Sequence, residues 1–161
     1  SKILKIIFFP IKNNFGQSIY LDFFNLSFSK NIYSLQNKFY RKYYRNKKTF
    51  SYKVHKKYIE EILKNPKIQL LVIKNKNNFV GYIKIEIKNK KSLVSIAIKK
   101  EFQGKNIASI MLEYLVKSNY FIYPPFAEIH ENNKSSLFAF KKAGFSINKN
   151  IKTFRWKLNL L

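Results

Sequence analysis

The 161-residue chain has no cysteine, and it has only four glycines, four prolines and eight acidic residues. Without thiols it can have no disulfide, no thiolate metal ligand and no cysteine nucleophile, and such an absence is typical of cytoplasmic proteins. No apolar run approaches the ~18 residues that span a membrane. The basic, then apolar start at Ser1 to Pro10 lacks the small-residue cleavage site of a signal peptide. We therefore expect a cytoplasmic protein without membrane contact.

The residues that are present favour a folded domain. Hydrophobic residues make up 46% of the chain and aromatic residues 17%, which is too much apolar material for a disordered protein. The length allows one domain with a substantial core, and neither a repeat nor a linker interrupts it. We expect a single domain over residues 1–161.

The charge is strongly one-sided, because 32 basic residues against 8 acidic ones give a formal net charge of +24. Three explanations stay open: nucleic-acid binding, an anionic small-molecule partner, or the Lys, Asn, Ile, Phe and Tyr usage of an AT-rich genome. The lysines are spread along the chain and recur on the polar faces of predicted elements, as with Lys84, Lys88 and Lys117. This spread favours compositional usage and makes nucleic acid the least favoured partner.

The most informative stretch runs from residue 93 to residue 109. An apolar run predicts a buried strand over 93–98, and a compact Gln-Gly-Lys-Asn-Ile-Ala turn follows at 103–108. Beyond the turn the apolar residues fall at helical spacing: Ile107, Ile110, Met111, Tyr114 and Leu115. A strand, tight loop and helix in this order point several backbone N–H groups at one spot, which suits a phosphate. An ordinary strand-to-helix turn is the alternative, and neither the Walker loop nor the dinucleotide fingerprint matches.

The segments before this stretch predict mixed secondary structure. We expect a strand over 2–9 and helices over 20–26 and 32–43. A further helix begins at the N-cap Ser51 and ends at Asn65-Pro66. Its apolar stripe is Val54, Tyr58, Ile59, Ile62 and Leu63. Strands over 68–73 and 79–88 then form an antiparallel meander with the 93–98 strand.

A second motif lies between residues 127 and 145. The pattern predicts a strand over 126–130, a helix over 134–143 and a closing hairpin over 145–158, with Phe154, Trp156 and Leu158 on one face. Asn133 can cap the helix and Gly144 lets the chain reverse. The order of elements predicts a mixed, mostly antiparallel α/β sheet flanked by helices.

The two motifs together resemble the GNAT superfamily of N-acetyltransferases, whose pyrophosphate loop follows the pattern Arg/Gln-x-x-Gly-x-Gly/Ala. Gln103 and Ala108 match the ends, and Asn106 stands where the family prefers Gly. Asn is the best non-Gly residue at a positive φ, so this departure is mild. The second motif is in register at Asn133, Ser136, Phe140, Lys142, Gly144 and Phe145. The resemblance implies a GNAT fold and acetyl transfer from acetyl-CoA to a primary amine, without a metal.

The resemblance also implies which residues bind acetyl-CoA. Backbone groups of the 96–98 strand would pair with the pantetheine arm as an added strand does, and N–H groups of the loop would hold the pyrophosphate. The expected cofactor-binding residues are Ile96, Ala97, Ile98, Gln103, Gly104, Lys105, Asn106, Ile107, Ala108, Ser109, Asn133, Ser136 and Phe140.

Acetylation requires a neutral amine, and an amine with a pKa of ~10.4 is mostly charged at pH 7. A general base is therefore useful, and Glu128 is the leading candidate, with His130 on the same face of its strand. The alternative for Glu128 is an ion pair with a lysine. The family often holds a tyrosine acid at the position of Phe140, so the group that protonates the leaving thiolate is unassigned. Tyr120 or Tyr123 could supply this proton instead.

The acceptor is the least determined part of the prediction. Residues 45–51, followed by His55 and Tyr58, resemble the GNAT branch that acetylates amino groups of nucleotide-linked sugars, including those of the pseudaminic acid pathway. That branch usually has Trp at the position of Tyr58. We expect His55 and Glu86 at the acceptor site and an amino sugar on a nucleotide as the small-molecule acceptor. A protein α-amine or lysine, and a non-enzymatic nucleic-acid-binding module, are the alternatives.

Overall fold

The computed structural model describes residues 11–12, 16–44, 47–151 and 155–160, and every structural statement below concerns these residues. Their strands form an eight-stranded sheet in the order β1-β2-β3-β4-β5-β6-β8-β7. The strands are β1 (Ile11–Lys12), β2 (Ser18–Phe23), β3 (Ile68–Asn75), β4 (Asn78–Lys88), β5 (Lys91–Ile98), β6 (Pro125–His130), β7 (Phe145–Ile151) and β8 (Arg155–Leu160). The α-helices are α1 (Ser29–Ser34), α2 (Tyr52–Lys64), α3 (Ile107–Lys117) and α4 (Lys134–Lys142). Short helical turns η1 (Leu26–Phe28), η2 (Leu35–Phe39), η3 (Arg41–Tyr43) and η4 (Lys100–Phe102) connect them. The predicted mixed, mostly antiparallel sheet is confirmed.

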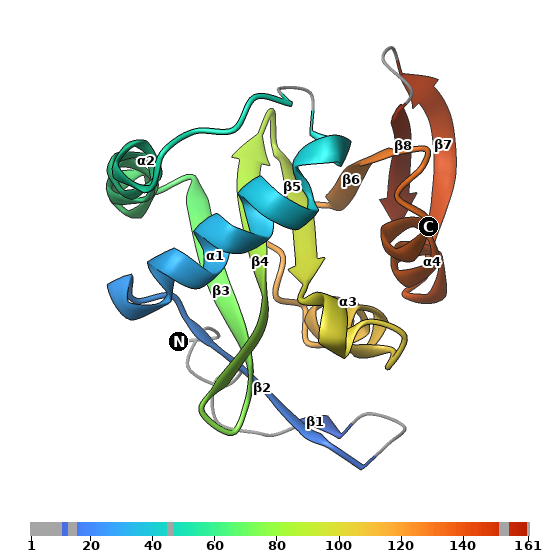
Figure 1. The fold of residues 1–161 in the computed structure, drawn as a ribbon. Coiled ribbons are helices and arrows are strands. Elements are labelled where there is room, and N and C mark those ends of the chain that lie inside the picture. Colours follow the sequence, from blue (N-terminus) through green and yellow to red (C-terminus); the bar gives the residue numbers. More distant parts are fainter. Residues whose placement is uncertain (1–10, 13–15, 45–46, 152–154, 161) are drawn as a thin grey trace.

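Helices cover both faces of the sheet, and α1 crosses the face formed by β3, β4 and β5 (Figure 1). Alternate residues of β3 divide between two cores, as expected for a strand that is buried on both sides. Leu71 and Ile73 belong to the core that contains Met111 of α3. Leu70 and Val72 belong to the core on the α1 and α2 face. The unbroken apolar run of β3 is therefore explained by burial on both faces.

The sheet forks between β5 and β6. The two strands pair in parallel only at Ser92↔Pro125 and Leu93↔Phe126, near the start of both strands. The Ser92 backbone N–H donates to the Pro124 carbonyl at 2.9 Å, which fastens the closed end. Beyond these pairs β6 continues with β8, and Figure 1 shows β6 leaving β5 on the side of α4. The open end of the fork exposes strand edges and is where a ligand can enter.

Helix α2 begins as predicted, because the Ser51 hydroxyl accepts a hydrogen bond from the Val54 N–H at 3.3 Å. Its buried face is rotated from the expected stripe. His55, Ile59 and Ile62 are buried, whereas Val54, Tyr58 and Leu63 are exposed. Only the Ile59 and Ile62 part of the predicted stripe therefore packs against the core.

The helix expected over 20–26 is wrong, because this segment contains strand β2. Leu21 pairs with Ile73 in an antiparallel register, and Ile19 and Leu21 alternate as buried positions. Pairing with the edge of β3 outweighs the helical spacing of the aromatic residues, as tertiary context often does. The helix expected over 32–43 exists as α1, η2 and η3, which begin at Ser29. The strand expected over 2–9 and Phe154 of the hairpin lie outside the described residues.

The C-terminal half follows the prediction closely. The antiparallel meander β3-β4-β5, helix α3, strand β6, helix α4 and the β7-β8 hairpin occur in the expected order. Gly144 has φ +101°, a conformation that favours glycine where the chain leaves α4.

Candidate active site

The loop between η4 and α3 has the conformation of an anion-binding turn. Gly104 and Asn106 both have positive φ, +75° and +60°, so the expected left-handed conformation at Asn106 is confirmed. The Asn106 carbonyl accepts the Ile110 N–H at 3.1 Å and the Ser109 hydroxyl at 3.0 Å, which starts α3. N–H groups in the first turn of α3 then lack partners further back in the helix, and they lie at its positive end. This arrangement suits a pyrophosphate.

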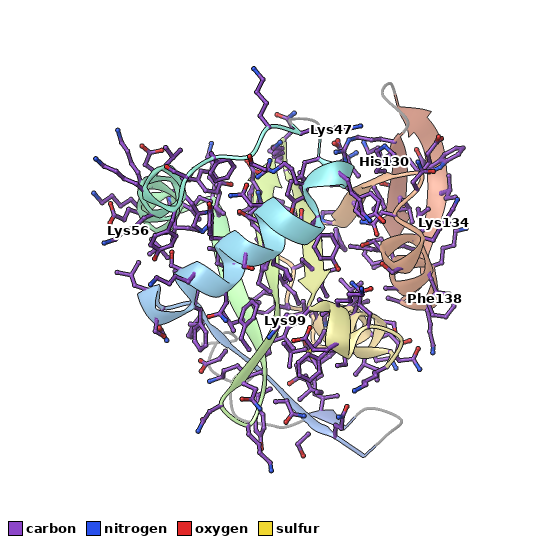
Figure 2. All side chains as sticks on the ribbon, viewed as in Figure 1. Lys47, Lys56, Lys99, His130, Lys134 and Phe138 are labelled. Carbon is purple, nitrogen blue, oxygen red and sulfur yellow. The ribbon has the colours of Figure 1, made fainter. Side chains whose placement is uncertain are left out.

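A cleft of about 360 Å³ lies between this loop, β5 and α4. Its lining is mostly apolar, so it suits the pantetheine arm and its flanking groups. The expected cofactor residues that line it are Ile96, Ile98, Gln103, Gly104, Asn106, Ile107, Ala108, Ser109 and Ser136. Lys105 is not among its lining residues, and its ammonium lies 5.5 Å from the centre of the Phe102 ring. Lys134 and Phe138 of α4 also line the cleft and are marked in Figure 2.

Tyr40, which sequence reasoning missed, closes part of the β5 edge. Its hydroxyl donates to the Ile98 carbonyl at 3.0 Å and accepts from the Ile98 N–H at 3.1 Å. The Gln103 amide donates to the same hydroxyl at 3.0 Å and to the Ile98 carbonyl at 3.2 Å. The backbone groups of Ile98 are thus used within the protein, contrary to the expectation that they pair with the cofactor arm. Burial raises the pKa of Tyr40, so this hydroxyl keeps its proton.

The fork itself contains a smaller cavity of about 120 Å³, and it brings the two predicted catalytic residues together. Glu128 and His130 of β6 line it, as do Ala97, Asn133, Ser136 and Phe140 from the expected cofactor set. The Asn133 side chain accepts from the Ser136 N–H at 3.3 Å and caps α4 as predicted. The His130 Nδ1 accepts from the Asn132 N–H at 3.1 Å, which fixes the orientation of the imidazole. The centre of the His130 ring lies 5.9 Å from the centre of the Tyr43 ring in η3, and His130 is marked in Figure 2.

A third cavity of about 340 Å³ lies on the other side of the fork, next to α2. Arg41 and Lys84 are the charged residues of its lining, and the Arg41 guanidinium lies 4.9 Å from the Tyr44 ring centre and 4.8 Å from the Phe50 ring centre. The residues that line it are Gln36, Arg41, Tyr44, Phe50, Val54, Tyr58, Tyr82, Lys84 and Ser95, and none of these is acidic. We name it the acceptor chamber. Tyr44, Tyr82 and Ser95 line both this chamber and the fork cavity, so the two are adjacent.

The structure places His55 behind the acceptor chamber instead of in it. The imidazole is fully buried, with the Phe50 and Tyr58 rings of the chamber wall 6.1 and 6.4 Å away. Neither ring nitrogen makes a well-formed hydrogen bond among the described residues, although the Ser29 backbone lies close. Burial lowers the pKa of His55 and outweighs the opposing effect of that backbone group. His55 therefore supports the wall and is not placed to touch an acceptor.

Three other sequence candidates lie away from the fork. Glu86 lines neither the fork cavity nor the acceptor chamber, and its carboxylate is 3.9 Å from the Lys88 ammonium. The Tyr120 hydroxyl donates to the Gln69 side chain in a separate cavity. Tyr123 is not among the lining residues of the fork cavity. The sequence shows which strand face or chain segment Glu86, Tyr120 and Tyr123 belong to, but it does not show how far each side chain lies from the fork.

The described helices include none that is long and apolar enough to cross a membrane. Within the same residues, no cluster of three or more His, Cys, Asp or Glu side chains could hold a metal ion.

The comparisons with known proteins agree with this geometry. No curated protein matches the chain. Among solved structures, a domain from Methanocaldococcus jannaschii superposes with a TM-score of 0.77 at 19% identity, covering 89% of this chain and 98% of that one. Spermidine N-acetyltransferase from Vibrio cholerae, in complex with CoA and spermine, gives 0.76 at 15% identity, with 89% and 95% covered. A ribosomal L7/L12 α-N-protein acetyltransferase in complex with coenzyme A gives 0.75 at 14% identity, with 88% and 92% covered.

At 14–19% identity, the likeness to these solved structures shows only the fold. The family is shown by a match of the sequence to a family model. The model of the acetyltransferase (GNAT) domain matches residues 32–156, which contain the loop, the fork and the acceptor chamber. The chain therefore belongs to the GNAT family of acetyltransferases, which use acetyl-CoA as their co-substrate.

Proposed function

We propose that the enzyme acetylates the primary amine of a small molecule that also carries negative charge, and that an amino sugar on a nucleotide is the first candidate. The observation that carries the proposal is the chemistry of the acceptor chamber. Its lining combines Arg41 and Lys84 with the rings of Tyr44, Phe50 and Tyr58, and it contains no acidic residue. A phosphate can pair with the guanidinium, and a planar base can stack on the rings.

The same lining argues against a polyamine acceptor. Spermidine carries several positive charges, and a chamber with Arg41 and Lys84 would repel them. The spermidine N-acetyltransferase of Vibrio cholerae shares the fold at 15% identity. An identity this low gives no reason to expect that the two proteins share a substrate. A nucleotide-linked sugar instead offers an anionic group for the chamber and an amine for the fork.

The proposed mechanism is direct attack of the amine on the thioester. The positive-φ loop and the start of α3 hold the pyrophosphate of acetyl-CoA, and the cleft directs the thioester into the fork. Glu128 then accepts the proton that the ammonium must lose before it attacks. Lys105, and His130 as a second proton acceptor, stay proposals of lower priority, and Glu86 and His55 are not placed to take part.

A panel of amines with release of free CoA thiol as the readout tests the acceptor. We expect turnover with a UDP-linked amino sugar, little with spermidine, and little with a peptide that carries a free α-amine. Arg41→Gln should raise the KM for the amino sugar without raising the KM for acetyl-CoA, because the chamber lies outside the cofactor cleft. A preference for spermidine would refute the anionic acceptor. Salt-dependent RNA binding with no effect of acetyl-CoA on melting would support the nucleic-acid module instead.

A further inference from the structure

The fork lacks a proton donor at the position of Phe140. This ring is buried and packs edge-on against Phe145, with the ring centres 5.0 Å apart. A phenyl ring can shape the cavity but cannot protonate a leaving thiolate. Four tyrosines from other elements line the same cavity: Tyr40, Tyr43, Tyr44 and Tyr82. A hydroxyl from one of them can take over this step.

The position of each hydroxyl separates these candidates. The Tyr40 hydroxyl already donates its only proton to the Ile98 carbonyl. The Tyr43 ring lies against His130, 5.9 Å between centres, and Tyr43 does not line the acceptor chamber. Tyr44 and Tyr82 line both cavities, so they stand where an amine from the chamber meets a thioester in the fork.

Tyr44 and Tyr82 belong to a short hydrogen-bonded chain. The Gln36 side-chain amide donates to the Tyr82 hydroxyl oxygen at 3.1 Å, and the two tyrosine hydroxyls are 3.3 Å apart. If Tyr82 donates to Tyr44, the Tyr44 proton is left to point into the shared cavity. Each bond of such a chain polarises the next one and strengthens the terminal donor. Tyr82 is nearly inaccessible to solvent, which leaves Tyr44 as the end that a substrate can reach.

We propose that the Tyr44 hydroxyl is the general acid that protonates the leaving thiolate of CoA. When the tetrahedral intermediate collapses, the carbon–sulfur bond breaks and its electron pair goes to sulfur. The Tyr44 proton moves to that sulfur and gives the free thiol. The nitrogen has lost one proton to Glu128 before the attack, and it loses a second proton to solvent as the intermediate collapses to the amide. Tyr44 is then reprotonated by solvent. The inference rests on the proposed acetyl transfer and adds the residue that completes it.

The charges around Tyr44 are consistent with a protonated acid at neutral pH. Burial raises the pKa of Tyr44, and the bond from Tyr82 and the charge of Arg41 oppose this only partly. Tyr40 and Tyr58 face the same hydroxyl and add small upward effects. The acid form should therefore persist to alkaline pH, and activity should fall only where Tyr44 ionises.

Steady-state kinetics of Tyr44→Phe with acetyl-CoA and the best acceptor of the amine panel test the proposal. We expect kcat to fall about tenfold or more, with little change in the KM for acetyl-CoA, because only the proton is lost. The alkaline decline of kcat that we expect for the wild type should also be absent in this variant. Tyr120→Phe is the matched control, since it removes a hydrogen-bonded hydroxyl remote from the fork and should keep wild-type kinetics.

A rescue variant makes the test specific. Phe140→Tyr places a hydroxyl in the fork from α4, so it should restore most of the activity of Tyr44→Phe and change the wild type little. Unchanged kcat in Tyr44→Phe would overturn the proposal, as would a lower kcat with the alkaline decline retained. If Phe140→Tyr does not fold, the comparison of kcat at alkaline pH between the wild type and Tyr44→Phe still tests the proposal. Absence of any acetyl transfer by the wild type would instead refute the proposed function.

Discussion

At the scale of single residues, the proton acceptor is the first question that mutation can answer. Glu128→Gln keeps the size and hydrogen-bonding capacity of the side chain that lines the fork, but it removes the basic carboxylate. We expect kcat to fall about 10²-fold or more, while the affinity for acetyl-CoA stays unchanged. Glu86→Gln is the control, because Glu86 lies on β4, two strands away from Glu128 on β6, and does not line the cavity. Wild-type turnover of Glu128→Gln at all pH values would leave Glu128 with a structural role.

His55 leads to a prediction about stability. In the unfolded chain its pKa is ~6.5, and burial lowers the pKa in the folded protein. Between these two values the unfolded state binds more protons, so His55 favours folding fully above about pH 6.5 and loses this contribution as pH falls. Replacing His55 with Phe should flatten the fall in the urea midpoint between neutral and mildly acidic pH. If the urea midpoint falls by the same amount in the wild type and in His55→Phe, His55 titrates normally in the folded protein.

Sequence reasoning could predict which loop and strand residues lie side by side, because their proximity depends on local order. Gln103, Gly104 and Asn106 lie within four positions of one loop, and Glu128 and His130 share one strand, so spacing alone brings each set together. Arg41 and Tyr44 belong to the η3 turn and its C-cap, whereas Tyr82 belongs to β4, so the turn and the strand meet only after folding. No periodicity indicates such a meeting, which explains why the acceptor chamber was not predicted and why His55 was misplaced.

At the scale of elements, the order of strands and helices was predictable where burial repeats with a clear period. The meander β3-β4-β5 and helix α3 show this. Segment β2 was misassigned because Tyr20, Phe23 and Phe24 have helical spacing, whereas its pairing with β3 decides the structure. The splitting of β5 from β6 was also unpredictable, because it depends on where pairing stops rather than on which residues pair.

The connection between η4 and α3 gives a prediction at this scale. Gly104 has φ +75° and open space where a Cβ would stand, so any side chain fits but the backbone is strained. Gly104→Ala therefore measures strain alone, about 1–2 kcal/mol of stability. Gly104→Asp adds a carboxylate at the pyrophosphate site and should weaken acetyl-CoA binding by about tenfold or more beyond the alanine variant. Equal affinities of the two variants by calorimetry would remove the loop from the cofactor site.

At the scale of the whole molecule, the net charge of +24 raises the question of which positive charges matter. Figure 2 shows side chains of Lys47, Lys56, Lys99 and Lys134 on different parts of the surface. Charges beyond the Debye length of ~8 Å from a bound anion are largely screened at physiological salt. The charge can therefore be compositional over most of the surface and still contribute to binding around the cofactor cleft.

Two triple variants with the same change in net charge separate these contributions. One replaces Lys105, Lys134 and Lys142 near the cleft with Gln, and the other replaces the exposed Lys53, Lys56 and Lys64 of α2. Each solvated contact with a phosphate contributes up to about 1 kcal/mol, so the cleft variant should raise the KM for acetyl-CoA by about tenfold and reduce its salt dependence. The α2 variant should keep both values, because α2 packs on the opposite face of the sheet from α3 and the loop that precedes it. Equal increases in the two variants would mean that the field of the whole protein attracts acetyl-CoA, and no increase in either would leave the backbone N–H groups of the loop to hold the pyrophosphate.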